Sequence, residues 1–331
     1  MKPTLPRALI PVLRRLDDGR FHSGQELAGE FGLSRASVCN LMSLAGELGV
    51  RVHAVRGRGY RLPDAMTWLD VAHVSQALAE HAPTFVVHIE EGVDSTNSRL
   101  MTWAQAGAPE GTVVAAEYQL AGRGRRGRPW VAQLGGNLTF SVLWRFDGGL
   151  QAMNGLSLAV GLAVARAVKR STTKPVGLKW PNDILVERRK LAGILIEAQG
   201  DMNEAAFAVV GVGLNVRLPP AQRLVIDQPV VDLVEIGASL DRNALLADCL
   251  REMHRAVAQF RAGGFAALRT SWAALDAYAG HAVCVHLADG RQFSGVAAGV
   301  DDSGAFLLRT PQGELRPFHG GEISLRLETA K

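Results

Sequence analysis

Residues 119–130 read QLAGRGRRGRPW, and this stretch decides between two classes of fold. Its glycines match the G-x-G-x-x-G pattern of dinucleotide-binding folds, in which a helix opens at the third glycine and an acidic residue follows about 20 positions later. Here Pro129-Trp130 and a Gly135-Gly136 turn follow instead and lead into another strand. The context therefore excludes the dinucleotide-binding fold. It predicts a flexible arginine loop (residues 122–130) that suits a phosphate or acyl-phosphate group, with a solvated basic loop as the alternative.

Strands and helices mix on both sides of the arginine loop. The hydrophobic patterns predict strands at residues 85–90, 112–117, 137–144, 177–179, 184–187, 191–197 and 205–212, and helices at residues 96–106 and 155–170. This order is typical of an α+β domain in which helices cover a mixed sheet.

Three further segments place polar side chains at the ends of these strands. Residues 94–97 (DSTN) either cap a helix or face a small polar ligand, and capping is the better interpretation of the segment alone. Residues 179–183 (KWPND) display an amide and a carboxylate after a proline break. Residues 188–195 (RRKLAGIL) place Lys190 at the mouth of a strand, where a lone lysine is usually a surface residue. Beside the arginine loop, Lys190 becomes a candidate phosphate or carboxylate clamp.

The first 65 residues predict a winged helix-turn-helix. A helix over residues 9–16 precedes a capping box formed by Ser23 and Glu26, and a second capped helix starts at Ser34. Strands at 51–55 and 60–62 enclose the sequence RGRG, so the wing has a basic tip.

The charge of the chain supports a nucleic-acid partner for this segment. The formal net charge is +4, and residues 1–65 hold ten basic residues against six acidic ones, which is the whole excess. A winged helix can also serve as a protein–protein module, and the second helix offers few polar side chains for reading bases. The residues predicted to face DNA are Gly24, Ser34, Arg35, Ser37, Asn40, Arg56 and Arg58.

The C-terminal third predicts helices at residues 242–261 and 265–278. From His281 onward, short strands alternate with Asp-Gly, Asp-Ser-Gly and Gln-Gly turns, which favours a small β-barrel.

Composition limits the class of protein. A chain of 331 residues with 47% hydrophobic and 21% charged residues predicts a folded protein of two or three domains. Three distant cysteines indicate neither a disulfide framework nor a zinc site, so no metal-ligand set is predicted. The N-terminus lacks the pattern of a signal peptide, and the apolar run at 156–168 is too short to span a bilayer. We therefore expect a soluble, cytoplasmic protein without a membrane partner.

Four motifs in order carry a specific resemblance: DSTN, EYQLAGRGRRGRPW, KWPNDI and RKLAGIL. With GVGLNV, LDRN and GGEISLR further along and a winged helix ahead, the chain resembles the bacterial family of bifunctional biotin–[biotin carboxyl carrier protein] ligases and biotin operon repressors. The resemblance implies three domains: a winged helix-turn-helix at 1–65, a mixed-sheet α+β catalytic domain of the class II synthetase/biotin ligase type at 66–278, and an SH3-like β-barrel at 279–331.

The family resemblance also implies a reaction and partners. Biotin, ATP and Mg²⁺ would give biotinoyl-5′-AMP, and a lysine of the biotin carboxyl carrier protein of acetyl-CoA carboxylase would then take the biotinoyl group. The adenylate-bound form would dimerise, bind operator DNA and repress biotin-synthesis genes. The alternative is a monofunctional ligase whose winged helix does not regulate transcription.

Site residues follow from the same motifs. The biotin site would comprise Ser95, Thr96, Asn97, Gln119, Arg123, Gly124, Arg125 and Lys190, of which Arg123, Arg125 and Lys190 would be catalytic. The adenylate and ATP site would comprise Arg126, Arg128, Trp130, Asn182, Asp183 and Asn215. One departure concerns residues 216–240, which form a second ordering loop in the family, in some members with a tryptophan on the adenine. This chain has no tryptophan between Trp180 and Trp272, which leaves the ordering of that loop open.

Overall fold

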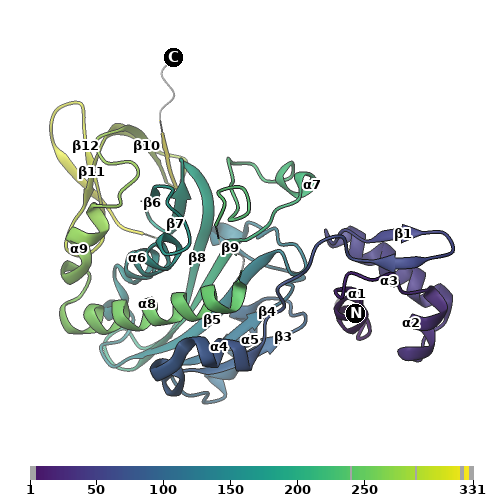
Figure 1. Ribbon diagram of the computed structural model, residues 1–331. Coiled ribbons are helices and arrows are strands. Elements are labelled where there is room, and N and C mark those ends of the chain that lie inside the picture. Colours follow the sequence, from purple (N-terminus) through teal and green to yellow (C-terminus); the bar gives the residue numbers. More distant parts are fainter. Residues whose placement is uncertain (1–4, 239–240, 288, 321–323, 328–331) are drawn as a thin grey trace.

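The computed structural model describes residues 5–238, 241–287, 289–320 and 324–327. A small winged helix lies to one side of a larger body that contains the central sheet, and a second sheet lies at the opposite side of that body (Figure 1). Parts of two family motifs, Leu240 of LDRN and residues 321–323 of GGEISLR, lie outside the described residues.

The winged helix forms as the sequence predicts. The Ser23 side chain accepts from the Glu26 amide and the Glu26 side chain from the Ser23 amide, which confirms the capping box, and the Ser34 hydroxyl caps the next helix. Apolar side chains from all three helices meet in one core. The elements are α1 (Leu9–Leu16), α2 (Gly24–Glu30), α3 (Arg35–Glu47), β1 (His53–Val55) and β2 (Gly59–Arg61).

A charged cluster at the α1–α2 junction makes the stability of the winged helix depend on pH. Asp18 accepts from His22 Nε2 at 2.9 Å, from the Arg20 amide at 2.8 Å and from Arg15 Nη1 at 2.8 Å. These hydrogen bonds, led by that from His22, lower the pKa of Asp18 from 3.8 to about 2. Because the folded-state pKa is depressed, Asp18 stabilises the fold above pH 3.8 and loses that contribution as the pH falls towards 2.

We therefore expect Asp18→Asn to lower the thermal midpoint of unfolding most above pH 4, with the difference from wild type shrinking towards pH 2. Thermal unfolding followed by circular dichroism between pH 2 and 6 measures this difference. A deficit that stays constant over that range would contradict the assignment.

The central sheet has seven strands in the order β3-β4-β5-β9-β8-β7-β6, and only β3 and β4 pair in parallel among them. This confirms the predicted mixed sheet. Its strands are β3 (Val86–Glu90), β4 (Thr112–Ala116), β5 (Asn137–Phe146), β6 (Val176–Lys179), β7 (Asp183–Val186), β8 (Arg189–Gly200) and β9 (Ala206–Asn215). The helices beside it are α4 (Val71–Leu78), η1 (Ala79–Thr84), α5 (Thr96–Gln105), η3 (Leu150–Met153), α6 (Leu156–Lys169) and α8 (Arg242–Gly263).

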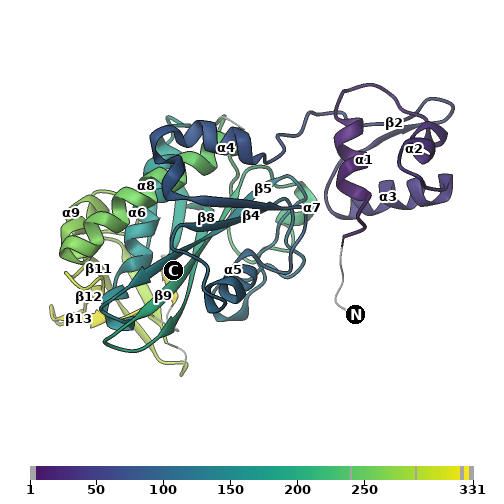
Figure 2. The same cartoon turned by 90° about the horizontal axis from the view of Figure 1, so that it is seen from below.

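The period-two alternation of the strands produces two faces with different uses. Phe140, Val142 and Val210 join the main core with α6 and α8, whereas Leu143 and Val209 pack against α5. Figure 2 shows α5 on one side of the strands and α6 and α8 on the other. The face beneath α6 and α8 is filled with apolar side chains, so polar chemistry is concentrated on the α5 side.

One apolar stretch has the length and hydropathy of a membrane-spanning helix. It runs from Leu150 to Lys169 and includes η3 and α6. Most of it is buried against the sheet and α8, as expected of a core helix in a globular domain.

A buried ion pair fixes the start of α8 to the end of β4. The Arg242 side chain is 1% exposed and pairs with Glu117, which has no exposed side-chain surface. Arg242 also donates to the carbonyl oxygens of Thr67, at 2.8 Å, and Asn137, at 3.0 Å, while Glu117 accepts from the Leu69 amide at 2.6 Å. One pair of charges therefore connects α8, two strands and the segment that leaves the winged helix.

The winged helix and the larger body share part of a core. Leu134 comes from the segment just after the arginine loop, yet it is fully buried among the apolar residues of the winged helix. Its amide donates to the Leu48 carbonyl at 3.1 Å, and Gln133 Nε2 donates to the Gly49 carbonyl at 2.9 Å. Two carbonyls at the C-terminal end of α3 are thus satisfied by the body that carries the central sheet.

The C-terminal segment forms a five-stranded antiparallel sheet in the order β13-β12-β11-β10-β14. The predicted short strands are confirmed, whereas closure into an SH3-like barrel stays a prediction. The second predicted helix, 265–278, is shorter than expected. α9 (Ala266–Ala273) ends early because Asp276 forms a parallel bridge with Leu178 at the edge of the central sheet, and the Ala277 amide donates to the Leu178 carbonyl at 2.8 Å. The strands are β10 (Ala282–His286), β11 (Gln292–Val300), β12 (Phe306–Arg309), β13 (Leu315–Phe318) and β14 (Ser324–Leu327).

Candidate functional site

A cavity of about 430 Å³ opens on the α5 side of the sheet, next to the arginine loop. Every residue that the motifs suggested for a small-molecule site lines it. These residues are Ser95, Thr96, Asn97, Gln119, Arg123, Gly124, Arg125, Arg126, Arg128, Trp130, Asn182, Asp183, Lys190 and Asn215.

One end of the cavity is a buried network of neutral polar groups. The Thr96 amide donates to Gln119 Oε1 at 2.8 Å, so a side chain from the next strand connection caps the first turn of α5. Ser95 makes no capping hydrogen bond with its side chain, although it stands at the N-cap position. The capping interpretation of residues 94–97 is therefore wrong for the Ser95 hydroxyl. Its hydroxyl, buried beside the cavity, remains able to contact a ligand.

Ser141 completes this network from β5. Its hydroxyl lies 2.7 Å from Thr96 Oγ1 and 2.6 Å from Asn97 Oδ1. Sequence reasoning missed Ser141, although Asn137, Thr139 and Ser141 alternate with apolar residues in the predicted strand. Polar residues at every second position of a buried strand are a usable signal of a polar pocket.

The arginine loop is anchored at two points by residues outside it. Arg123 Nη2 lies 3.0 Å from Ser98 Oγ and 3.1 Å from Glu197 Oε1. Arg125 Nη1 donates to Asn182 Oδ1 at 3.1 Å, and burial lowers the pKa of Arg125. A guanidinium that is already desolvated loses less hydration when it meets an anion, which strengthens the pairing.

Arg126 and Arg128 extend the positive charge to the cavity mouth. Both side chains are exposed, and Arg126 stands in the 3₁₀ turn η2 (Arg125–Gly127) with a φ of +60°. This conformation turns the loop back on itself, and the Gly124 amide donates to the Arg128 carbonyl at 2.7 Å.

Lys190 faces the cavity from β8. Its Nζ lies 2.7 Å from Asp183 Oδ1 and 5.7 Å from the centre of the Trp130 ring. Lys179 lines the same cavity, and burial lowers the pKa of its ammonium group. Together with the arginines, six basic side chains and two carboxylates, Asp183 and Asp227, line the cavity among the described residues. The electrostatic balance favours an anionic ligand.

Two glycines of the GVGLNV motif make room for side chains of the site. A Cβ on Gly211 would stand 2.1 Å from Asn97 Oδ1, and a Cβ on Gly213 would stand 2.5 Å from Trp130 Cε2. The motif therefore provides close approach of α5 and the arginine loop to β9. Asn215 has a structural task as well, because its Nδ2 donates to the Val231 carbonyl at 3.2 Å.

Sequence reasoning also missed Glu197, and it left open how the second loop (residues 216–240) is ordered. Glu197 accepts from Asn97 Nδ2 at 2.9 Å and so connects the neutral network to Arg123. Within the second loop, residues 225–228 and Val230 line the cavity. These contacts span long separations in sequence, and no local pattern indicates them.

The residues predicted to face DNA lie on α2, α3 and the wing. Arg35 and Asn40 are exposed on α3, whereas the Ser34 and Ser37 hydroxyls lie 2.8 Å apart at its first turn. Gly24 is half-buried in the first turn of α2. The wing tip exposes Arg56 and Arg58, and the Arg58 guanidinium stacks 4.3 Å from the centre of the Phe21 ring.

Known protein families and relatives match this chain over nearly its whole length. Residues 90–215 match the biotin/lipoate A/B protein ligase family, residues 280–326 the biotin protein ligase C-terminal domain, and residues 10–61 an HTH domain. The bifunctional ligase/repressor BirA of Escherichia coli is 37% identical over 323 residues, which cover 98% of each chain. The chain belongs to the biotin protein ligase family.

Other members of the biotin protein ligase family agree in sequence and in fold. The bifunctional ligase/repressor BirA of Bacillus subtilis is 28% identical over 330 residues, which cover 98% of this chain and 100% of the relative. The structure of the biotin protein ligase from Aquifex aeolicus, in complex with biotin and ATP, superposes with a TM-score of 0.62 at 30% identity. It covers 73% of this chain and 99% of the Aquifex chain.

Proposed function

We propose that this chain is an ATP-dependent biotin–[biotin carboxyl carrier protein] ligase and an adenylate-dependent transcriptional repressor. The main support for this proposal is that one cavity combines a buried network of neutral polar groups, a basic loop and Lys190. The neutral network suits the ureido ring of biotin, and the basic half suits a carboxylate next to phosphates.

In the first step, an oxygen of the biotin carboxylate attacks the α-phosphorus of ATP, the bond to the β-phosphate oxygen breaks, and pyrophosphate leaves. The product is biotinoyl-5′-AMP. Negative charge accumulates on the non-bridging oxygens at the α-phosphorus, so Lys190, Arg123 and Arg125 are assigned to stabilise it. The arginine loop then shields the mixed anhydride from water.

In the second step, the neutral amine of the carrier lysine attacks the acyl carbon of the adenylate. An amide bond forms, the bond to the phosphate oxygen breaks, AMP leaves, and the amine releases a proton. The nucleophile belongs to the carrier protein of acetyl-CoA carboxylase, so the ligase needs no covalent nucleophile of its own.

Mg²⁺ would bind together with ATP, coordinated mainly by the phosphates and not by a set of protein ligands alone. The described residues contain no cluster of three or more potential metal ligands, but Asp183 and Asp227 are carboxylates on the cavity wall. This donor set fits Mg²⁺, which binds through one or two carboxylates plus substrate phosphates and neutralises phosphate charge.

The repressor half of the proposal assigns residues 1–65 to operator DNA, 66–278 to catalysis and 279–331 to a C-terminal barrel. We place the protein in the cytoplasm and propose that the adenylate-bound form dimerises on the operator. Whole-length similarity to two bifunctional ligase/repressors favours this function over a monofunctional ligase.

One mixture tests the ligase: protein, biotin, Mg-ATP and an apo-carrier domain, with transfer scored by mass spectrometry. We expect one biotinoyl group on the carrier lysine, and no transfer would reject the ligase. In parallel, binding to DNA upstream of biotin-synthesis genes is measured with and without biotinoyl-AMP. Binding that ignores sequence and adenylate would reject the repressor.

The wing provides a prediction of its own. Arg58→Ala removes one proposed phosphate contact, so the affinity should fall uniformly across DNA sequences. The negative slope of log affinity against log salt should become shallower by about 1. Arg51→Ala is the control, because Arg51 pairs with Asp64 at the base of the hairpin. Equal slopes for wild type and Arg58→Ala would exclude the wing tip as a phosphate contact.

A further inference from the structure

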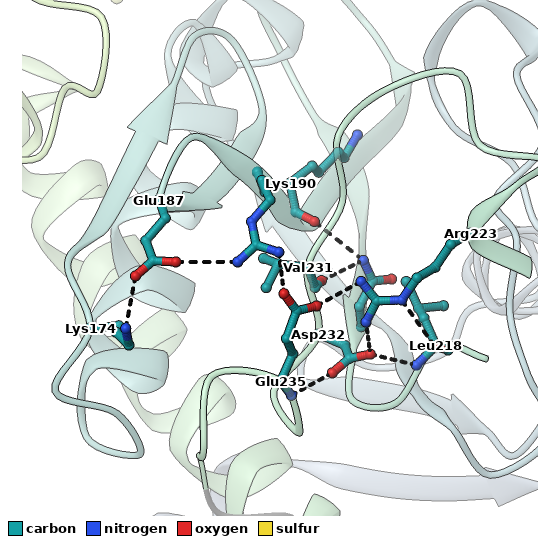
Figure 3. Close-up of polar contacts among 10 residues, drawn as sticks. Lys174, Glu187, Lys190, Leu218, Arg223, Val231, Asp232 and Glu235 are labelled. Carbon is teal, nitrogen blue, oxygen red and sulfur yellow. Dashed lines mark hydrogen bonds and ion pairs between the residues drawn. The ribbon is translucent and has the colours of Figure 1, made fainter. Parts of the chain in front are cut away.

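A chain of ion pairs connects the second loop (residues 216–240, of which the structure describes 216–238) to the β7–β8 hairpin (Figure 3). Glu187 of the hairpin lies 2.9 Å from Lys174 Nζ and 3.2 Å from Arg189 Nη2. Arg189 in turn pairs with Glu235 of the second loop, and Glu235 lies 2.7 Å from Arg223 Nη1. The hydrogen bond from Arg189 lowers the pKa of Glu235 and Arg223 adds to this effect, so that carboxylate stays ionised.

The buried end of this chain is the pair formed by Arg223 and Asp232. The Asp232 side chain is 4% exposed and also accepts from the amides of Leu218 and Glu235, each at 2.8 Å. Arg223 stands at the end of α7 (Pro220–Arg223), and its Nε donates to the Leu218 carbonyl at 3.1 Å. One guanidinium thus links the beginning of the second loop to its end, and without it a buried carboxylate would lack a counterion.

The second loop is also bonded to the backbone of the lysine that faces the cavity. The Lys190 amide donates to the Pro229 carbonyl at 2.9 Å, and the Val231 amide donates to the Lys190 carbonyl at 3.0 Å. Residues 225–228, just before these contacts, line the cavity. Leu224 and Val225 are 87% and 70% exposed, so apolar packing does little to hold this part of the loop.

We propose that Arg223 is a positioning residue of the ligase. Its pairs with Asp232 and Glu235 hold the second loop against the Lys190 strand, so that residues 225–228 and Val230 form a wall of the cavity on which the nucleotide of ATP binds. The ion pairs order the loop in this chain, which has no tryptophan there. Only the kinetic part of the inference rests on the proposed function.

The structural part is tested by hydrogen exchange on the full-length protein. In Arg223→Met, amides of the second loop, including that of Val231, should exchange about tenfold faster or more, because a charge-assisted pairing with a buried carboxylate is lost. Arg217→Met removes a charge from the same loop, but Arg217 faces Asp64 at 3.8 Å, away from the cavity. This control should leave the exchange unchanged.

The kinetic part separates positioning from general damage. Arg223→Met should raise the KM for ATP about tenfold with little change in the KM for biotin, and Arg223→Lys should recover part of the loss. In the double variant Arg223→Met/Asp232→Asn, the KM for ATP should lie below that of Arg223→Met, since no unpaired charge remains.

The outcomes distinguish the two proposals. Unchanged exchange in Arg223→Met, equal effects of Arg217→Met, or faster exchange with an unchanged KM for ATP would each overturn the role of Arg223. A wild-type protein that transfers no biotin would reject the proposed function, whereas faster loop exchange in Arg223→Met would still establish Arg223 as the residue that holds the loop.

Discussion

Arg242→Met is expected to destabilise the ligase by about 3–5 kcal/mol, because it leaves the Glu117 carboxylate buried without its counterion. The Thr67 and Asn137 carbonyls lose their donor in the same change. Thermal unfolding measures the effect, and at roughly 2–4 °C per kcal/mol the midpoint should fall by about 10 °C.

Two further variants show whether the buried charge is the cause. In Arg242→Met/Glu117→Gln the unpaired charge is removed, so the double variant should lose clearly less than the sum of the two single losses. Arg261→Met breaks a half-exposed pair with Glu110 at 2.7 Å and should cost about 1 kcal/mol or less. Additive losses in the double variant would refute the explanation.

Arg125→Ala is expected to release biotinoyl-5′-AMP prematurely. Arg125 lines the cavity, is held by Asn182 at 3.1 Å and is largely desolvated, so its hydrogen bonds to a phosphate would be strong. Losing a hydrogen bond to a charged group costs about 1.5–3 kcal/mol, which corresponds to adenylate dissociation roughly 10- to 100-fold faster.

The measurement is the dissociation rate of biotinoyl-5′-AMP, together with biotin transfer to bystander proteins. Transfer should remain possible but become indiscriminate, because the activated acyl group reacts in solution with any accessible lysine. Arg99→Ala is the matched control, since Arg99 pairs with Glu90 at 3.5 Å and does not line the cavity. Retention of the adenylate equal to wild type would refute the role assigned to Arg125.

Most of the fold could be predicted from local sequence patterns. The capping box at Ser23 and Glu26 and the period-two strands of the central sheet involve neighbours in sequence, so they could be predicted with errors of a few residues at the ends. The end of α9 could not be predicted, because Asp276 forms a bridge with Leu178, a residue far away in the sequence.

In the candidate site, too, the residues in local motifs could be predicted and those brought in by tertiary packing could not. Motif residues such as Thr96, Arg125 and Lys190 were predictable and do line one cavity. Ser141, Glu197 and Arg223 were missed, because their partners are set by tertiary packing of distant segments. Ser95 was ambiguous between a cap and a ligand contact until Gln119 was found to supply the cap instead.

The burial of Leu134 in the winged-helix core has a consequence for modularity. The winged helix is not an independent unit that ends at its own second strand, because Leu134, from the segment after the arginine loop, completes its core. If residues 1–65 were fused to another enzyme, the core of the winged helix would have a cavity at the position of Leu134. The carbonyls of Leu48 and Gly49 at the end of α3 would also lose their hydrogen-bond donors. A winged helix that is exchanged between ligases must therefore be transferred together with the segment that contains Leu134.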